Sequence, residues 1–162
     1  MPSVYLETTI FGYLASRPTR NLIVAGHQRL TRAWWTTRAK QFDLRVSTLV
    51  IEEIAAGDPR SARARLKFTA GIPVVEMTAS AIDLADTYRT RLPLPPRAAR
   101  DALHIALAVV HELDYLLTWN CAHIANGHVI LRLQLLNRKR KRTTPVILTP
   151  EELMEPMEPY TP

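Results

Sequence analysis

Four oxygen-bearing side chains stand where the chain would leave a strand or enter a helix. They are Glu7, Asp101, Asn120 and one of the adjacent pair Glu52 and Glu53. Carboxylates that meet at short range repel one another unless a cation neutralises them. A hard divalent ion such as Mg²⁺ or Mn²⁺ suits oxygen ligands and keeps several of its waters. The four side chains therefore predict a divalent-metal site, provided that the fold brings them together.

Asp101 and the two adjacent glutamates also have purely structural interpretations. Asp101 lies in the first turn of a helical pattern, where the helix dipole favours an acid. Glu52 and Glu53 are about 100° apart around their helix, so only one of them can face a given target. A solvated acidic pair is the commoner case, and the pattern alone leaves the choice between the two open.

The elements that would position these side chains alternate along the chain. The helical pattern after Asp101 is the clearest, because apolar residues recur with a helical period from Ala102 to Val110. We also expect Thr8 or Thr9 to cap a helix that begins after Glu7. Apolar runs predict strands at 4–6, 44–48, 73–75, 115–118 and 145–148, and helical patterns predict helices at 22–42, 49–54, 60–68, 79–91, 100–110 and 124–137.

This alternation predicts an α/β fold with a mainly parallel sheet of about five strands flanked by helices. In such sheets, ligand sites form beyond the carboxyl ends of the strands, where the strand order reverses. Glu7 and Asn120 would lie directly past strand ends, and Asp101 and Glu53 would lie early in helices at the same edge. The four side chains are therefore expected to converge.

Composition and charge favour one globular domain with a polyanionic partner. The chain has 162 residues, of which 47% are hydrophobic, and a net charge of +6. Residues 151–162 form an acidic, proline-rich tail that holds four of the fifteen acids and none of the twenty-one basic residues. Residues 1–150 therefore carry a net charge of +10, which suits nucleic acid, although ordinary solubility charge is the alternative.

Several other features point to a cytoplasmic protein. The apolar runs are too short to cross a membrane, and the single cysteine, Cys121, cannot form an internal disulfide. We expect Cys121 to be a buried small residue. Trp34 and Trp35 are expected in the core or at an interface, and their apolar helix faces exceed what a small sheet needs, which favours a dimer.

The chain resembles the PIN-domain family, the metal-dependent ribonucleases that include the VapC toxins. The resemblance covers about residues 3 to 148 and rests on four motifs in order, namely Val4–Ile10, Ser47–Ile54, Arg100–Ala108 and Leu116–Asn120. It implies a PIN-like three-layer sandwich in residues 1–150. It also selects Glu53 over Glu52, because the family glutamate directly precedes an aliphatic residue. Glu7 and Asn120 stand where the family usually has aspartate.

The resemblance implies hydrolysis of RNA with Mg²⁺ or Mn²⁺. Glu7, Asp101 and Glu53 would be the metal-site acids, with Glu53 ligating the ion or orienting the attacking water, and Asn120 would complete the catalytic set. His104 is expected to pack against a neighbouring helix. The candidates for contact with substrate are Thr8, Thr118, His123, Arg138, Lys139 and Arg140.

Two functions remain open at this point. The first is an active ribonuclease, the toxin of a type II toxin–antitoxin pair, which the family resemblance also implies to be a homodimer with an antitoxin partner. The second is a catalytically degenerate PIN-fold module that binds nucleic acid or protein without cleaving, which the departures at Glu7 and Asn120 favour.

Overall fold

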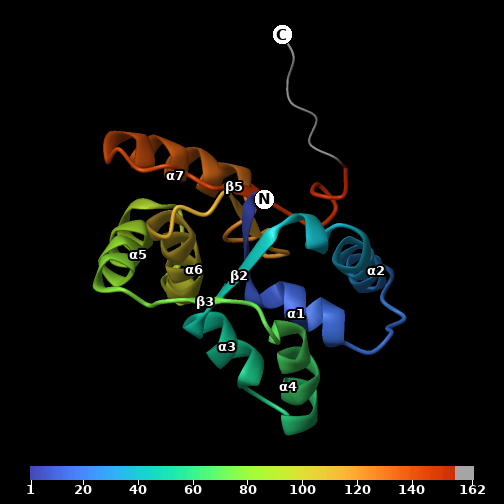
Figure 1. Ribbon diagram of the computed structural model, residues 1–162. Coiled ribbons are helices and arrows are strands. Elements are labelled where there is room, and N and C mark those ends of the chain that lie inside the picture. The colour runs from blue at the N-terminus through green and yellow to red at the C-terminus, as the bar shows by residue number, and fades with distance from the viewer. Residues whose placement is uncertain (156–162) are drawn as a thin grey trace.

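A five-stranded sheet forms the centre of the computed structural model, which describes residues 1–155. The strand order is β3-β2-β1-β4-β5, and every pairing is parallel (Figure 1). Parallel strands are usually covered on both faces, and the side chains of Val4, Tyr5 and Leu6 in the central strand are fully buried. The strands are β1 (Ser3–Leu6), β2 (Asp43–Ser47), β3 (Val74–Val75), β4 (Tyr115–Leu117) and β5 (Val146–Leu148).

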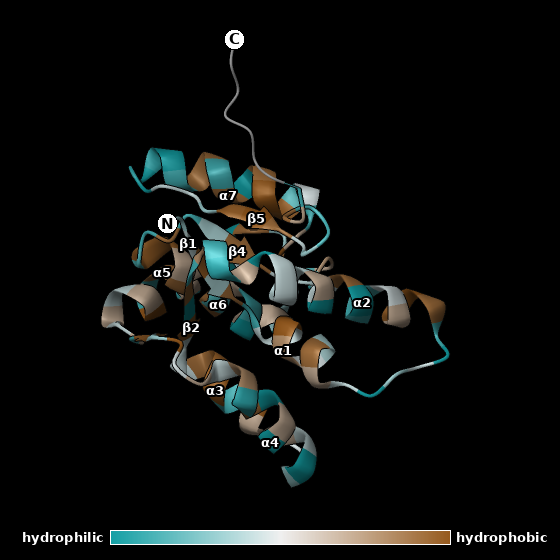
Figure 2. Ribbon diagram, turned by 45° about the vertical axis from the view of Figure 1, so that its right-hand side comes forward, coloured by the Kyte–Doolittle hydropathy of each residue, from teal (hydrophilic) through white to brown (hydrophobic). Residues whose placement is uncertain are grey.

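Helices cover both faces of this sheet. Figures 1 and 2 show α5, α6 and α7 on one side and α1 and α2 on the other, while α3 and α4 extend past one end. This is the three-layer α/β arrangement that the sequence predicted. The helices are α1 (Thr8–Ala15), α2 (Leu22–Thr37), α3 (Thr48–Ala55), α4 (Pro59–Leu66), α5 (Ala79–Arg91), α6 (Ala99–Val110) and α7 (Gly127–Lys139).

Trp34 of α2 belongs to the core, and Trp35 packs against it. Trp34 is fully buried and lies 5.9 Å from the ring of Phe42. Trp35 makes edge-on ring contacts with Phe11 and Phe68. The fold therefore uses both tryptophans, whereas Leu22 and Ile23 at the start of α2 stay exposed.

Two predicted helices have different bounds from those that their patterns indicated. The helix predicted over 22–42 ends at Thr37, whose hydroxyl donates to Ala33 O at 2.7 Å, and a short 3₁₀ turn follows before β2. The helix predicted over 124–137 begins at Gly127 instead, because the Asn126 side chain accepts from the backbone N–H groups of the first turn. Apolar periodicity alone does not show where polar capping groups begin or end a helix.

Residues 149–155 join the body beyond β5. Leu153 is fully buried in the common core, and Thr149 is bonded to Glu152. The rest of the predicted tail, residues 156–162, lies outside the described residues. Within residues 1–155, no helix combines the length and apolar character needed to span a bilayer.

Candidate active site

The strand order reverses at β1, which pairs with β2 on one side and with β4 on the other. A crevice at the carboxyl ends of two such strands is where parallel α/β sheets bind ligands. Glu7 directly follows β1, and its backbone N–H donates to Leu117 O at 3.0 Å. Asn120 follows β4 by three residues. The two strands therefore bring residues more than a hundred positions apart to one edge of the sheet.

Glu7 is nearly buried, with 4% of its surface exposed, and it caps α1. Its Oε2 accepts from Thr9 N at 3.0 Å, from the Thr9 hydroxyl and from the Thr118 hydroxyl at 2.8 Å. The expectation that a threonine would cap this helix was wrong. The chain is extended at Glu7, so its longer carboxylate folds back onto the first turn. No described residue donates a hydrogen bond to Glu7 Oε1.

Asp101 and Asn120 are joined through His123. The Nδ1 atom of His123 lies 2.8 Å from Asp101 Oδ2, and both side chains are 20% exposed. The backbone N–H of His123 donates to Asn120 Oδ1 at 3.0 Å. The Asn120 side chain therefore braces the turn that carries His123, and His123 contacts an acid.

Glu53 faces the same edge, while Glu52 is exposed. The Thr8 hydroxyl donates to Glu53 Oε1 at 2.6 Å, and His104 Nε2 lies 2.6 Å from the same oxygen. Arg100 lies 3.7 Å from Glu53 Oε2. Arg100 and His104 belong to α6 on either side of Asp101, so Glu53 docks against the helix that carries the second acid.

Burial and hydrogen bonds act in opposite directions on the Glu53 carboxyl. Burial raises its pKa, but the hydrogen bonds from His104 and Thr8 outweigh burial, together with the charges of His104 and Arg100. The net effect holds the pKa of Glu53 below its usual range. Glu53 is therefore maintained as an anion at neutral pH.

A buried hydrogen-bond chain supports His104 from the other side. Tyr5 Oη lies 2.7 Å from His104 Nδ1 and 2.8 Å from Ser47 Oγ, which itself accepts from Val50 N. Burial raises the pKa of Tyr5 far above its usual value, so its hydroxyl keeps its proton. A consistent assignment has Tyr5 donating to Nδ1 and His104 Nε2–H donating to Glu53. His104 therefore positions an acid as well as filling space.

Sequence reasoning missed Tyr5, Thr9 and Ser47 as parts of the site. Polar atoms on buried strands need partners, so a tyrosine within the apolar run of β1 was a usable signal. Cys121 was expected to be buried but is exposed, because it follows β4 in an open turn instead of entering a helix.

The donor chemistry suits a hard dication, although the acids do not form a tight triad. Among residues 1–155, no three His, Cys, Asp or Glu side chains gather into a group that could hold a metal ion. Mg²⁺ commonly uses one or two carboxylates and retains several waters, so it does not need such a triad. Glu7 Oε1 and Asp101 Oδ1 receive no hydrogen bond from the described residues and fit this mode of binding.

The basic run lies at the opposite end of the sheet from the acids. Arg138 and Lys139 end α7, and Arg140 caps it. The chain then enters the amino end of β5, where Val146 N donates to Asp114 O. Arg140 also lines a hollow against α5 with Asp83. The predicted substrate residues are therefore divided, since Thr8, Thr118 and His123 lie among the acids.

No family model matches the sequence, and no curated protein matches it. Solved structures do match. The structure of VapBC2 from Rickettsia felis bound to a DNA fragment from their promoter matches with a TM-score of 0.56 and 13% identity, over 91% of this chain and 98% of that one. VapC20 of Mycobacterium tuberculosis, a toxin that cleaves the sarcin-ricin loop, matches with a TM-score of 0.54 and 15% identity, over 70% of this chain and 86% of that one.

These matches define the class of fold. The chain has the PIN-domain α/β fold, which confirms the fold that its motifs predicted. In particular, it is similar in structure to VapC toxins.

Proposed function

We propose that this protein is a divalent-metal-dependent ribonuclease and the toxin of a type II toxin–antitoxin pair. The observation that carries the proposal is the placement of Glu7, Glu53 and Asp101 around the reversal point of the sheet. Three separate segments of the chain supply them, and hydrogen-bonded side chains hold each one. The same fold occurs in VapC20, a toxin that cleaves the sarcin-ricin loop.

Each acid has a distinct role in this proposal. Glu7 and Asp101 would hold Mg²⁺ or Mn²⁺, directly or through water, because each presents an oxygen with no hydrogen bond from a described residue. When bound, the ion supplies charge to a phosphate oxygen and lowers the pKa of water. Glu53, fixed by His104 and Thr8, would ligate the ion or orient the attacking water.

The polar residues between the acids position them. The Thr8 hydroxyl donates to Glu53 and the Thr118 hydroxyl donates to Glu7. We therefore infer that both threonines orient carboxylates rather than contact the substrate. His123 is partly exposed beside Asp101 and is the better candidate to meet an RNA phosphate. Asn120 fixes the turn that presents it.

One observation favours the second candidate, a PIN-fold module that binds without cleaving. Glu7 Oε2 already accepts three hydrogen bonds, and the described residues contain no three-ligand group. If the departures at Glu7 and Asn120 had removed catalysis, the same surface would still bind nucleic acid or an antitoxin.

The decisive experiment is calorimetric titration with Mn²⁺ together with an RNA cleavage assay. We expect wild type to bind Mn²⁺ and cleave, and both Asp101→Asn and Glu53→Gln to lose cleavage. Asp101→Asn should also weaken Mn²⁺ binding. Glu52→Gln is the matched control, because it makes the same change one residue away on an exposed position. A wild-type protein that binds RNA but neither binds Mn²⁺ nor cleaves would establish the binding module.

A further inference from the structure

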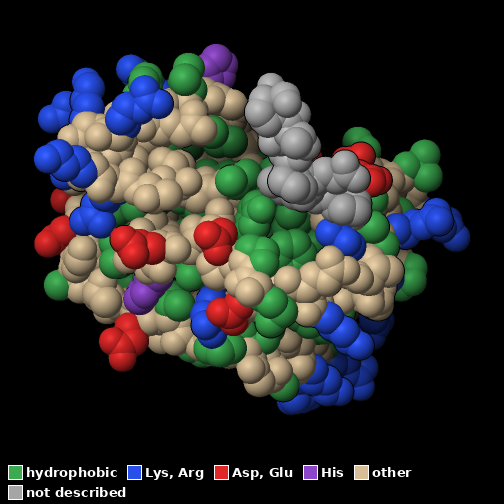
Figure 3. Space-filling model, turned by 45° about the horizontal axis from the view of Figure 1, so that its top comes forward, with side chains coloured by type: hydrophobic (Ala, Val, Ile, Leu, Met, Phe, Trp, Pro, Cys, Tyr) green, Lys and Arg blue, Asp and Glu red, His purple; other side chains and the backbone are tan. Residues whose placement is uncertain are grey.

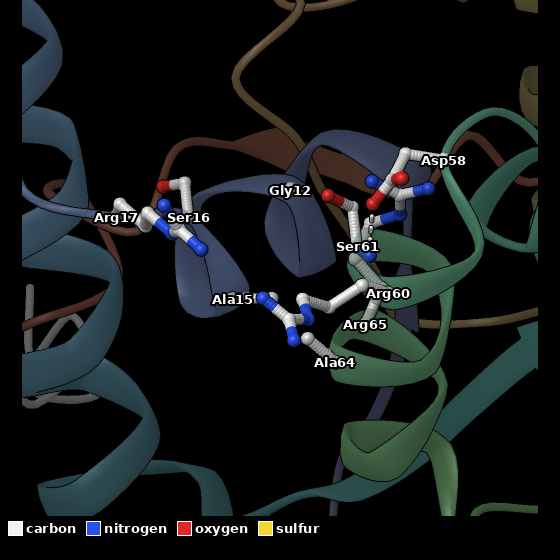
Figure 4. Close-up of a pocket in the computed structure, with 9 residues that line it drawn as sticks. All are labelled: Gly12, Ala15, Ser16, Arg17, Asp58, Arg60, Ser61, Ala64 and Arg65. Carbon is white, nitrogen blue, oxygen red and sulfur yellow. Dashed lines mark hydrogen bonds between the residues drawn. The ribbon is translucent and has the colours of Figure 1, made fainter.

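Two hollows flank α1 where its side chains are smallest. One lies between α1 and α4, has a volume of about 670 Å³ and is lined by arginines just after α1 and on α4 (Figure 4). The other lies between α1 and α2, has a volume of about 320 Å³ and is mainly apolar. Gly12 and Ser16 line both hollows, so the two meet across the surface of α1.

The smaller hollow adjoins the acids. Thr9 lines it, and the Thr9 hydroxyl donates to Glu7 Oε2 while accepting from Trp119 N at 2.9 Å. Tyr13 also lines it, and its ring makes edge-on contacts with His27 and Trp119, which stack on each other at 3.9 Å. An aromatic group therefore stands beside the proposed cleavage site and is held by other rings.

Gln28 gives this hollow a polar acceptor. It is only 4% exposed, and its Nε2 donates to Ser16 Oγ and to Arg17 O, both at 2.8 Å. A backbone carbonyl can only accept, so the nitrogen must face Arg17 O and the amide orientation is fixed. Gln28 Oε1 then receives no hydrogen bond from any described residue. Among the described residues, the buried side-chain polar atoms without a partner are Trp34 Nε1 and Arg38 Nε, so Gln28 Oε1 is open to the hollow, where the donor group of a ligand can reach it.

The larger hollow offers positive charge. The guanidinium groups of Arg17 and Arg60 donate to no acceptor among the described residues. Arg65, in contrast, is committed to Ile54 O and Ala56 O at the end of α3. Asp58 is the one acid that lines this hollow, and its carboxylate accepts from Ser61 N. Arg17 also interacts electrostatically with Asp58, but the arginines outnumber this single acid, so the hollow has a net positive charge that suits a phosphate.

We propose that this surface binds the RNA strand next to the cleaved bond, an inference that rests on the proposed function. One nucleobase enters the smaller hollow against Tyr13, and its exocyclic amino group donates to Gln28 Oε1. The neighbouring phosphate lies at Arg17 and Arg60. Adenine, cytosine and guanine carry such an amino group and uracil does not, so the site discriminates against uracil.

Gly12 provides a test that leaves the fold intact. A Cβ atom placed on Gly12 would meet no atom within 4 Å, and the residue lies inside a helix where glycine is a weak former. Gly12→Leu therefore directs a side chain into the open space where the hollows meet, and its Cβ atom meets no neighbour. Gly26→Leu is the matched control, because Gly26 lies in α2, is equally open and lines neither hollow.

The probes are fluorescent eight-nucleotide RNAs of cytosine or of uracil, with EDTA present so that cleavage cannot occur. We expect wild type and Gly26→Leu to bind the cytosine oligomer several-fold more tightly than the uracil oligomer. Gly12→Leu should bind the cytosine oligomer about tenfold more weakly and lose the preference. Its melting temperature should be no lower than that of wild type.

The remaining outcomes overturn the inference in distinguishable ways. If wild type binds and cleaves RNA but Gly12→Leu behaves like wild type, the ribonuclease stands and this groove is not its RNA site. Equal affinity for the two oligomers would show that Gln28 Oε1 does not contact the base. If Gly12→Leu blocks an antitoxin peptide but not RNA, the hollow is a peptide site. If wild type neither binds nor cleaves RNA, the proposed function fails as well.

Discussion

The three carboxylates are held by different donors, and this difference gives each a separate chemical character. Glu7 is fixed by threonine hydroxyls and a backbone N–H, Glu53 by an imidazole and a hydroxyl, and Asp101 by one imidazole. Donors that are already in place orient an acid before any ligand arrives. Substitutions at single residues can therefore separate folding from chemistry.

Glu53 should contribute a pH-dependent part of the stability. Because its folded-state pKa is lowered, this contribution is present above the usual pKa of 4.5 and is lost as pH falls through the folded-state value. Glu53→Gln should lower the free energy of unfolding by about 1–3 kcal/mol at neutral pH. Urea unfolding should show the difference between the variant and wild type shrinking as the pH falls below 4.5. A difference in unfolding free energy that is the same at every pH would show that the lowered pKa of Glu53 is not its cause. Glu52→Gln is the control.

Asn120→Asp should strengthen metal binding. The two side chains are nearly isosteric, and an aspartate can still accept from His123 N. One added negative charge near a dication should improve Mn²⁺ affinity by about 1 kcal/mol, roughly fivefold, and raise cleavage. Calorimetry with Mn²⁺ measures this directly. Unchanged affinity, alongside loss of binding in Asp101→Asn, would show that Asn120 only braces its turn.

At the scale of elements, α1 and α6 carry the site because each begins at the carboxyl edge of the sheet. The helix α1 follows β1 with only Glu7 between them, and α6 presents Asp101 in its first turn. The Tyr5–His104 hydrogen bond joins β1 to α6 inside the core. The distance between the acids thus depends on the packing of two helices against one strand.

The cap of α1 can be separated from metal binding. Glu7→Gln retains an acceptor for Thr9 N, whereas Glu7→Ala removes it and should cost about 1–2 kcal/mol of unfolding free energy. Both variants lose the charge and should weaken Mn²⁺ binding. Thermal unfolding and calorimetry on the same samples test this. Equal stability of the two variants would show that the cap contributes little.

At the scale of the whole molecule, charge is distributed unevenly. On the face shown in Figure 3, Lys and Arg side chains gather toward two opposite corners, with acidic side chains between them. The run from Arg138 to Arg142 lies at the amino ends of the strands and the acids at the carboxyl ends. An RNA long enough to reach both ends would bind with a steeper salt dependence than a short one.

We expect a homodimer. The core uses Trp34 and Trp35, but Leu22 and Ile23 at the start of α2 are 87% and 73% exposed, and Leu131 on α7 is 56% exposed. Apolar groups in such exposed positions are commonly covered by a partner. Sedimentation equilibrium at tens of micromolar should give twice the mass of one chain. A single species with the mass of one chain would contradict this.

The order of strands and helices followed from the sequence alone. The helix over 79–91 was predicted to the residue, and the Ser47 cap of α3 lies where its strand was expected to end. Local periodicity and capping chemistry depend on neighbours within a few positions, so a single sequence contains them.

Only the tertiary structure decided how the side chains meet. The motifs placed Glu53 and Asp101 at one edge, but packing turned Glu53 toward His104 and Glu52 toward solvent. Packing also places the basic run from Arg138 to Arg142 at the far end of the sheet. It brings the Tyr5 hydroxyl into contact with His104 at the site. The helical period determines how side chains are spaced around a helix axis. Which side of the helix faces the core depends on contacts between residues distant in the chain.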